Sequence, residues 1–357
     1  MKRFILFYLL IANMCFAISL KANYAVLMDF ETGEVIYQKN GNEKTNPSSM
    51  TKIMTTYLIF KKLENKSLSI DDKFFVSENA WRQEGSRTFL AVHTKVSVDN
   101  LLRGLIVQSG NDAAITLAEG VNDNVDDFVK EMNNEALKMK LETTNFTNPI
   151  GFTSAQHYMS VYDLAVLSKN LIKDYPTLYK KYFPIKEFTW NKIKQPNRNV
   201  LLNYYKGVDG LKTGHTEAGG YGIVVSAERN GRRLISVING ATTQREREVE
   251  SEELLDIGWK AIREIVYKGG ETIKNFPLKY GKKDSVDVIA ESDVVFWSVL
   301  GEKAEPNIIF YKELKAPVKQ GERVGEILLG GRQYNLIVKE DVKEVNIFVK
   351  MYRKLFK

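Results

Sequence analysis

A serine and a lysine three residues apart are the first residues in this sequence with a spacing suited to catalysis. Asn46-Pro-Ser-Ser-Met-Thr-Lys52 places Ser49 and Lys52 in a Ser-x-x-Lys pattern. Pro47 favours a helix start, so both side chains should lie on one face of the first turn. A serine hydroxyl is a nucleophile only beside a base, and an amine is a base only if its pKa is lowered, as the positive end of a helix can do. The pair indicates acyl transfer through Ser49, although alone the pattern more often marks a solvated lysine on a helix.

Two further segments follow in an order that fits the same chemistry. Ser109-Gly-Asn111 begins 60 residues after Ser49, at the end of one helical run and before another, and Lys212-Thr-Gly214 follows ahead of a strand hairpin. Alone, the first could be a loop or a helix cap and the second a strand end. Together they are complementary, because Ser109 can pass a proton between Lys52 and a leaving amine. Asn111 can hold a peptide amide, and Lys212 with Thr213 offers a cation and a hydroxyl to a carboxylate.

The elements that must position these residues are readable from hydrophobic periodicity and turn signals. Strand patterns precede and follow a set of helical patterns, and Arg229-Asn-Gly231 is a strong hairpin signal. This order predicts an α+β fold, an antiparallel sheet with helices packed against it. The expected strands are 24–30, 34–38, 220–227 and 234–239, and the expected helices are 49–64, 98–120, 125–140 and 246–267.

The last part of the chain has a different hydrophobic pattern. From Phe276 it consists of short alternating runs, which predict a small all-β domain over residues 276–342 without a catalytic cluster. Gly269-Gly270 is the expected linker before it. The predicted catalytic domain therefore spans residues 23–268.

The first 22 residues are typical of a secretory signal peptide. Met1-Lys2-Arg3 precedes an apolar run, and small residues follow at Ala17 and Ala22. The run is short for a membrane span, which needs about 20 apolar residues. We expect export and cleavage after one of the two alanines; retention of the segment as an anchor is the alternative.

The last residues, 344–357, have the pattern of an amphipathic helix. Apolar side chains recur at helical spacing and cations occupy the other face. Such a helix suits an anionic membrane surface, whereas the alternative is an ordinary terminal helix packed on its own domain. The apolar stripe is Phe348, Met351, Tyr352, Leu355 and Phe356, and the cations are Lys350, Arg353, Lys354 and Lys357.

Composition excludes several other classes of protein. Basic residues number 51 against 44 acidic ones, and loss of Lys2, Arg3 and Lys21 with the leader leaves only +4, too little to indicate nucleic-acid binding. The single Cys15 excludes disulfides, and three scattered histidines form no HExxH pair. We therefore expect no metal and no cofactor. The neighbours Arg232-Arg233 are expected to be a solvated charge pair.

On its motifs the chain resembles the penicillin-interacting serine D-Ala-D-Ala carboxypeptidases, the low-molecular-mass penicillin-binding proteins. A closely similar triple, with Ser-Asp-Asn in the middle, is typical of penicillin-binding proteins and class A β-lactamases. The resemblance covers nearly everything after the leader, including the small β domain and the amphipathic tail. It rests on Ser-Ser-Met-Thr-Lys-Ile-Met-Thr, Leu-Leu-Arg-Gly-Leu-Ile-Val-Gln-Ser-Gly-Asn-Asp-Ala, Asn-Arg-Asn-Val-Leu-Leu and Val-Asp-Gly-Leu-Lys-Thr-Gly-His-Thr.

The resemblance implies a fold, a substrate and roles for the motif residues. The fold would be a penicillin-binding/β-lactamase-like domain, and the substrate peptidoglycan stem peptides ending in D-Ala-D-Ala, with β-lactams as covalent inhibitors. Ser49 would be acylated, Lys52 would be the general base and Ser109 the proton relay. The N–H groups of Ser49 and His215 would form the oxyanion hole. The expected substrate-binding residues are Asn111, Lys212, Thr213, Gly214, His215, Arg198 and Arg247, of which the two arginines, which would help to receive the terminal carboxylate, could equally be in structural ion pairs.

Two other functions remain open on the sequence. A class A β-lactamase uses an extra glutamate to activate the deacylating water, and Glu187 with Asn191 has the right spacing. That glutamate lies too close to Lys212 and in a strand-like stretch, so we interpret Glu187 as structural. The other alternative is a non-catalytic cell-wall binding protein that uses the β domain and the tail.

The resemblance implies a periplasmic location at the outer face of the cytoplasmic membrane.

Overall fold

The computed structural model describes residues 19–122, 124–299, 301–311 and 313–356. The predicted leader therefore lies outside the described residues except for residues 19–22. The chain divides into two compact units between Trp259 and Lys260. Each unit is described by itself.

The first unit is built on a five-stranded antiparallel sheet with the strand order β2-β1-β11-β10-β9. Asn230 and Gly231 both have positive φ, which suits a two-residue hairpin turn and sets the register of β10 and β11. Because β9 lies at the edge of the sheet, one row of its backbone groups is left free by the sheet. The strands are β1 Tyr24–Asp29, β2 Val35–Lys39, β9 Val208–Thr216, β10 Gly220–Arg229 and β11 Arg232–Ala241.

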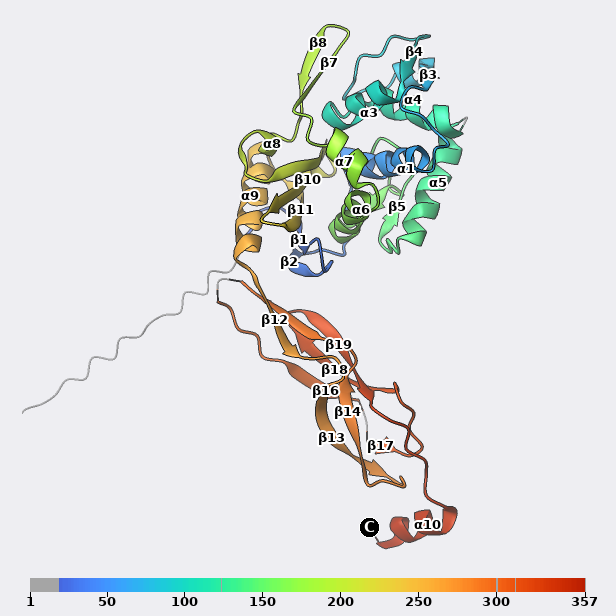
Figure 1. Ribbon diagram of the computed structural model, residues 1–357, viewed down its shortest axis with the longest axis vertical. Helices are drawn as coiled ribbons and strands as arrows, with labels where there is room; N and C mark the ends of the chain where they lie inside the picture. Colours follow the sequence, from blue (N-terminus) through green and yellow to red (C-terminus); the bar gives the residue numbers. More distant parts are fainter. Residues whose placement is uncertain (1–18, 123, 300, 312, 357) are drawn as a thin grey trace, which may run out of the picture. The chain divides into compact units, whose positions relative to one another are not determined.

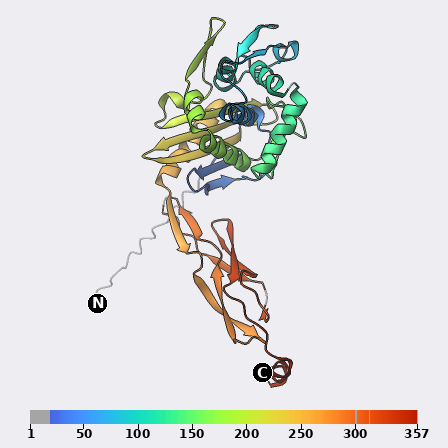
Figure 2. The same ribbon diagram turned by 45° about the vertical axis from the view of Figure 1, so that its right-hand side comes forward.

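Helices cover both faces of this sheet (Figures 1 and 2). On one face α6 packs on β1 and β11, and α1 continues the same hydrophobic core. On the other face α9 buries Leu254 and Leu255 against Leu27 and Ile223. The helices are α1 Lys52–Glu64, α2 Glu78–Trp81, α3 Val98–Val107, α4 Asn111–Asn122, α5 Val125–Lys138, α6 Val161–Asp174, α7 Pro176–Tyr182, α8 Leu201–Tyr204 and α9 Gln244–Lys260.

Three short two-stranded sheets complete the first unit. The β7–β8 pair forms a hairpin whose Asn191 side chain donates a hydrogen bond to the carbonyl of Phe89. The pairs are β3 Lys73–Phe75 with β4 Lys95–Ser97, β5 Thr144–Asn145 with β6 Tyr158–Met159, and β7 Glu187–Trp190 with β8 Ile193–Pro196.

The second unit is all-β apart from its terminal helix, α10 Ile347–Phe356. Its six-stranded sheet has the order β16-β18-β19-β14-β13-β17, and a separate pair joins β12 to β15. A core of its own, which includes Val288, Ile327 and Leu336, holds it together. The strands are β12 Ile262–Tyr267, β13 Thr272–Lys279, β14 Ser285–Ala290, β15 Val294–Ser298, β16 Asn307–Phe310, β17 Leu314–Lys315, β18 Arg323–Leu329 and β19 Arg332–Val338.

The α+β class is confirmed, but two expectations about the elements were wrong. The helix expected over 246–267 ends at Lys260, because residues 262–267 pair with β15 instead. Ile262 and Ile265 continue the helical spacing by chance, and tertiary pairing decides such a β-branched stretch. Gly269-Gly270 is no linker, since it is a turn inside the second unit whose Gly270 N–H donates to Ala290. The helical stretch 98–120 consists of α3 and α4, which agrees with the expectation of one helical run before Ser109-Gly-Asn111 and another after it.

Candidate active site

Ser49 and Lys52 lie at the junction of a short 3₁₀ turn, η1 Ser48–Thr51, and α1. Nζ of Lys52 is hydrogen-bonded to Oγ of Ser49 at 3.0 Å and donates to the carbonyl of Ile150 at 2.7 Å. The lysine side chain is 1% exposed. Burial, assisted by the nearby Arg198 cation and opposed by Asp112, lowers the pKa of Lys52 to about 7. About half of the amine is therefore neutral, and able to act as a base, at pH 7.

The carbonyl beside Lys52 is presented by a tight turn at residues 147–152. The side-chain oxygen of Asn148 accepts hydrogen bonds from the N–H groups of Ile150, Gly151 and Phe152. Gly151 has φ +86°, and a Cβ there would lie 1.8 Å from the carbonyl oxygen of Ser48. Only glycine allows this approach, which brings the turn against the serine.

Ser109 and Asn111 occupy the break between α3 and α4. Ser109 has φ +65°, and its buried Oγ has no hydrogen-bond partner among the described residues. The amide group of Asn111 donates to the carbonyl of Glu84 at 2.6 Å, and its own oxygen is buried without a described partner. Two buried polar oxygens in this break are thus left without a hydrogen-bond partner among the described residues.

Edge strand β9 packs against the η1 turn that holds Ser49. Gly214 passes so close to η1 that a Cβ would lie 3.0 Å from the carbonyl of Pro47. Lys212 is buried, and its Nζ donates to the carbonyl of Thr213 at 3.1 Å. Burial, together with the cations of Lys52, Arg198 and Arg247, holds the pKa of Lys212 well below its usual range.

The two candidate arginines differ in their surroundings. Arg247 on α9 is buried, and its Nη1 donates to the carbonyls of Gly214 and Gly222, while its Nε has no described partner. Arg198 is exposed to the cleft, and no carboxylate of the described residues pairs with its guanidinium. Arg247 therefore braces β9 against β10, and Arg198 has the more open cation.

These segments enclose a cleft of 720 Å³ that no aspartate or glutamate of the described chain lines. The structure brings most of the predicted residues to its surface, while Lys52, Asn111 and Lys212 lie behind it. The sequence did not single out Tyr221, whose ring stacks on His215 with centroids 3.9 Å apart, or Gln244 and Ser86. The lining is Ser49, Gly85, Ser86, Gln108, Ser109, Pro196, Asn197, Arg198, Val200, Thr213, Gly214, His215, Tyr221, Gln244 and Arg247.

Glu187 does not line this cleft. It is exposed on β7 and pairs with Lys194 across the hairpin at 2.8 Å. Its carboxylate therefore belongs to a surface ion pair, and no acidic side chain of the described residues lines the cleft.

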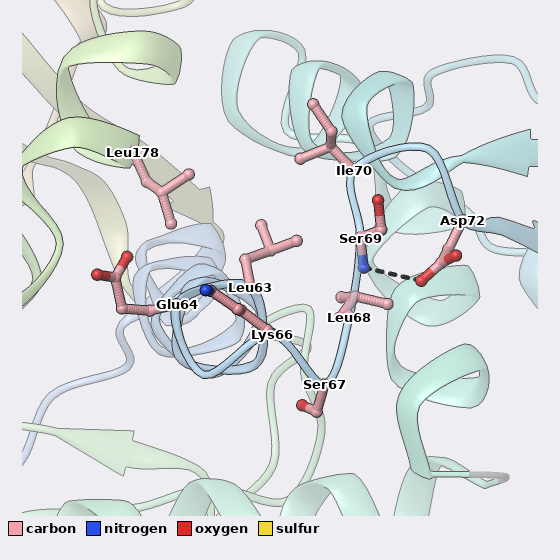
Figure 3. A pocket seen from close by; sticks show the side chains of 9 residues that line it. All are labelled: Leu63, Glu64, Lys66, Ser67, Leu68, Ser69, Ile70, Asp72 and Leu178. Carbon is pink, nitrogen blue, oxygen red and sulfur yellow. Dashed lines mark hydrogen bonds between the residues drawn. The ribbon is translucent and has the colours of Figure 1, made fainter.

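A second hollow, of 460 Å³, lies at the opposite end of α1 (Figure 3). Its hydroxyls come from Ser67 and Ser69, and Ser69 is tied through its backbone N–H to Asp72 at 2.8 Å. No base is hydrogen-bonded to either hydroxyl there, so this hollow offers no activated nucleophile. Its lining is Leu63, Glu64, Lys66, Ser67, Leu68, Ser69, Ile70, Asp72 and Leu178.

The described residues contain neither a candidate metal site nor a candidate membrane-spanning helix. No group of three or more histidine, cysteine or carboxylate side chains is arranged to hold a metal ion. No helix in the part of the chain that the structure describes has both the length and the apolar character needed to cross a bilayer.

A serine at a helix start, hydrogen-bonded to a buried amine beside a cationic cleft, defines a serine acyl-transfer enzyme. Comparison with known proteins narrows this class. Residues 12–243 match the D-alanyl-D-alanine carboxypeptidase family, peptidase S11, and residues 264–344 match the C-terminal domain of penicillin-binding protein 5. The chain therefore belongs to the D-alanyl-D-alanine carboxypeptidase family.

Individual members of this family match the sequence over most of its length. The D-alanyl-D-alanine carboxypeptidase DacA of Haemophilus influenzae is 38% identical over 341 residues, 92% of this chain and 86% of the relative. DacF of Bacillus subtilis is 35% identical, covering 87% of this chain and 81% of the relative. The crystal structure of penicillin-binding protein 5 from Haemophilus influenzae matches with a TM-score of 0.68 and 38% identity, over 91% of this chain and 98% of that one.

Proposed function

We propose that this protein is an exported serine D-Ala-D-Ala carboxypeptidase that removes the terminal D-alanine from peptidoglycan stem peptides. The observation that carries the proposal is the 3.0 Å hydrogen bond between Ser49 and a buried Lys52 in a cleft with cations and no lining carboxylate. Membership of the family supplies the substrate class. We assign catalysis to the first unit, which ends at Trp259, and not to the whole of the span 23–268 expected from the sequence.

Acylation follows from the geometry of Ser49 and Lys52. Neutral Lys52 takes the proton of the Ser49 hydroxyl while Oγ bonds to the carbonyl carbon of the penultimate D-alanine. The N–H groups of Ser49 and His215 would stabilise the resulting oxyanion. When the C–N bond breaks, the proton passes from Lys52 through Ser109 to the leaving amine. D-alanine departs and an ester on Ser49 remains.

Hydrolysis of this ester completes the cycle. Lys52 is neutral again after the proton transfer, so it can accept a proton from the attacking water. The water oxygen bonds to the ester carbon, the bond to Oγ of Ser49 breaks, and that oxygen regains a proton. A β-lactam forms the same ester but keeps its leaving amine tethered, so we propose that it remains covalently bound.

Assay of free D-alanine from a D-Ala-D-Ala peptide tests the reaction, and a fluorescent penicillin tests the adduct. Release of D-alanine with persistent labelling supports the carboxypeptidase. Rapid clearance of the adduct without D-alanine release would instead favour a β-lactamase. Absence of both would favour a non-catalytic wall-binding protein and would overturn the proposal.

Arg198 is expected to bind the terminal carboxylate of the substrate. Its guanidinium is open to the cleft, and a bidentate pair with a carboxylate is a strong, directional interaction. We predict that Arg198→Ala raises KM for a D-Ala-D-Ala peptide by roughly 10-fold, the effect of losing one charged hydrogen bond. For a peptide with an amidated C-terminus, Arg198→Ala should raise KM much less. Arg82→Ala, at a surface pair with Glu78, is the control, and an equal loss for both peptides would contradict the role.

The start of the first unit indicates where the leader is removed. The N–H groups of Lys21 and Ala22 donate to the buried carboxylate of Glu250, and Lys39 donates to the carbonyls of Leu20 and Ala22. Cleavage after Ala22 would delete these contacts. We therefore predict cleavage after Ala17, and the mass of the N-terminal peptide of the exported protein checks it. A chain beginning at Asn23 would contradict this prediction.

The terminal helix is expected to attach the protein to the outer face of the cytoplasmic membrane. On α10 the side chains of Ile347, Phe348, Met351 and Tyr352 are exposed, while Lys350 pairs with Glu344 beside the Tyr280 ring. An open apolar face beside cations suits an anionic membrane surface.

Removing this helix should release the protein. We predict that deletion of residues 345–357 shifts most of it from the membrane to the soluble fraction, with D-alanine release from a soluble peptide unchanged. Phe348→Ser with Met351→Ser should weaken cosedimentation with anionic vesicles, whereas Tyr311→Ser, at an exposed aromatic on the β unit, should not. An unchanged distribution of the deleted chain would count against attachment.

A further inference from the structure

His157 lies beneath the Ser49–Lys52 pair and is buried, with 2% of its surface exposed. It precedes β6 and contacts two different segments. Its Nε2 is 2.9 Å from Oγ1 of Thr51, in the η1 turn that also holds Ser49. Its Nδ1 is 3.0 Å from the backbone N–H of Thr147, at the start of the turn that presents the carbonyl of Ile150. One imidazole thus connects both segments that surround the amine of Lys52.

The hydrogen bonds assign the protonation of this ring. A backbone N–H can only donate, so Nδ1 must be the acceptor. The proton of the neutral ring is then on Nε2, which donates to Oγ1 of Thr51. Burial and the charge of Lys52 lower the pKa of His157 to about 4, which agrees with a neutral ring. A charged ring would place two donors, Nδ1–H and the Thr147 N–H, against each other.

We infer that His157 is a positioning residue for acylation, which holds the 147–152 turn so that the Ile150 carbonyl fixes Lys52 against Ser49. The inference rests on the proposed function of these two residues. The 2.7 Å bond from Lys52 to Ile150 and the 3.0 Å bond to Ser49 share one amine, so a displaced carbonyl displaces the base. Thr55 adds a second tie to the turn through the carbonyl of Pro149 at 2.7 Å. Loss of the imidazole should therefore misplace the turn without unfolding it.

Two substitutions separate the contacts of the ring. His157→Asn keeps an acceptor where Nδ1 lies but cannot reach Thr51, whereas His157→Gln reaches toward Thr51 and leaves the Thr147 N–H without an acceptor. Acylation of the purified full chain by a fluorescent penicillin, followed over a range of concentrations, yields a limiting rate and a half-saturating concentration. We expect His157→Gln to lower the limiting rate roughly 10- to 100-fold, the effect of leaving a buried group unpaired. The half-saturating concentration should stay within about three-fold, because the binding groups on β9 are untouched.

His157→Asn, which keeps the Thr147 contact and loses the Thr51 contact, should recover only part of the limiting rate, and His93→Gln, at an exposed histidine, should match the wild type. Thr51→Val tests the bridge from its other end and also applies if His157→Gln fails to fold; it should lower the limiting rate and not the half-saturating concentration. A role in filling space alone predicts that Asn is no better than Gln and that rates follow melting temperature. That result, or an unchanged limiting rate in both His157→Gln and Thr51→Val, would overturn the inference. Failure of the wild type to be labelled would instead refute the proposed function.

Discussion

Substitution of Ser49 by alanine is expected to abolish both covalent labelling by a fluorescent penicillin and release of D-alanine. Oγ of Ser49 becomes the ester oxygen, so its removal eliminates the covalent intermediate. Only substrate binding and oxyanion stabilisation then remain. Loss of a serine nucleophile costs catalysis on the order of 10⁴-fold or more in serine hydrolases. Gel fluorescence and a D-alanine assay measure the two losses.

The neighbouring serine supplies a matched control. Ser48 is also buried in η1, but its Oγ is hydrogen-bonded to Thr216 and Asn46 and has no amine beside it. We expect Ser48→Ala to keep labelling within about tenfold of wild type, since its two uncharged hydrogen bonds contribute about 1 kcal/mol each to stability and neither involves the amine of Lys52. Labelling of Ser49→Ala, or its loss in Ser48→Ala alone, would show that the nucleophile is misassigned.

The sequence predicted the chemistry of the cleft better than its shape. Side-chain types and order were enough to propose Ser49, Lys52 and Ser109 as candidates, because acyl transfer needs a hydroxyl, a base and a relay. The carbonyl of Ile150 could not be selected in this way, since every residue has one and only folding decides which carbonyl meets the amine. Asn148 and Gly151, in an Asn-Pro-Ile-Gly stretch, were the available signal for a tight turn there.

Charge in the sequence was also a poor guide to burial. The adjacent pair Arg232-Arg233 was expected to be solvated, and for Arg233 this was wrong. Strand alternation turns Arg233 inward, where it pairs with Asp209 and Glu228 and donates to Ser226. The partners are distant in sequence or on the facing strand, so no local pattern reveals that the buried cation is compensated.

The pH profile of acylation should follow the titration of Lys52. Its pKa in the folded protein is lowered from 10.5 to about 7, and only the neutral amine can take the proton of Ser49. The rate should therefore rise as pH increases through about 7, and should fall roughly tenfold per pH unit well below that value. Stopped-flow labelling between pH 5 and 8.5 measures the profile, with circular dichroism to show that the fold persists. A flat profile would contradict Lys52 as the base.

Lys52→Arg tests at fixed pH whether acylation needs a neutral amine at this position. A guanidinium keeps its proton throughout this range, so the variant retains a cation beside Ser49 but has no base. We expect acylation to fall by about 10³-fold, within the usual contribution of general-base catalysis, and to lose the rise with pH. If positive charge alone activated Ser49, the arginine variant would retain most of the rate. Because Arg198 already places a cation near Lys52, positive charge is not what the site lacks; burial and this cation together lower the pKa of Lys52 and so favour the neutral amine.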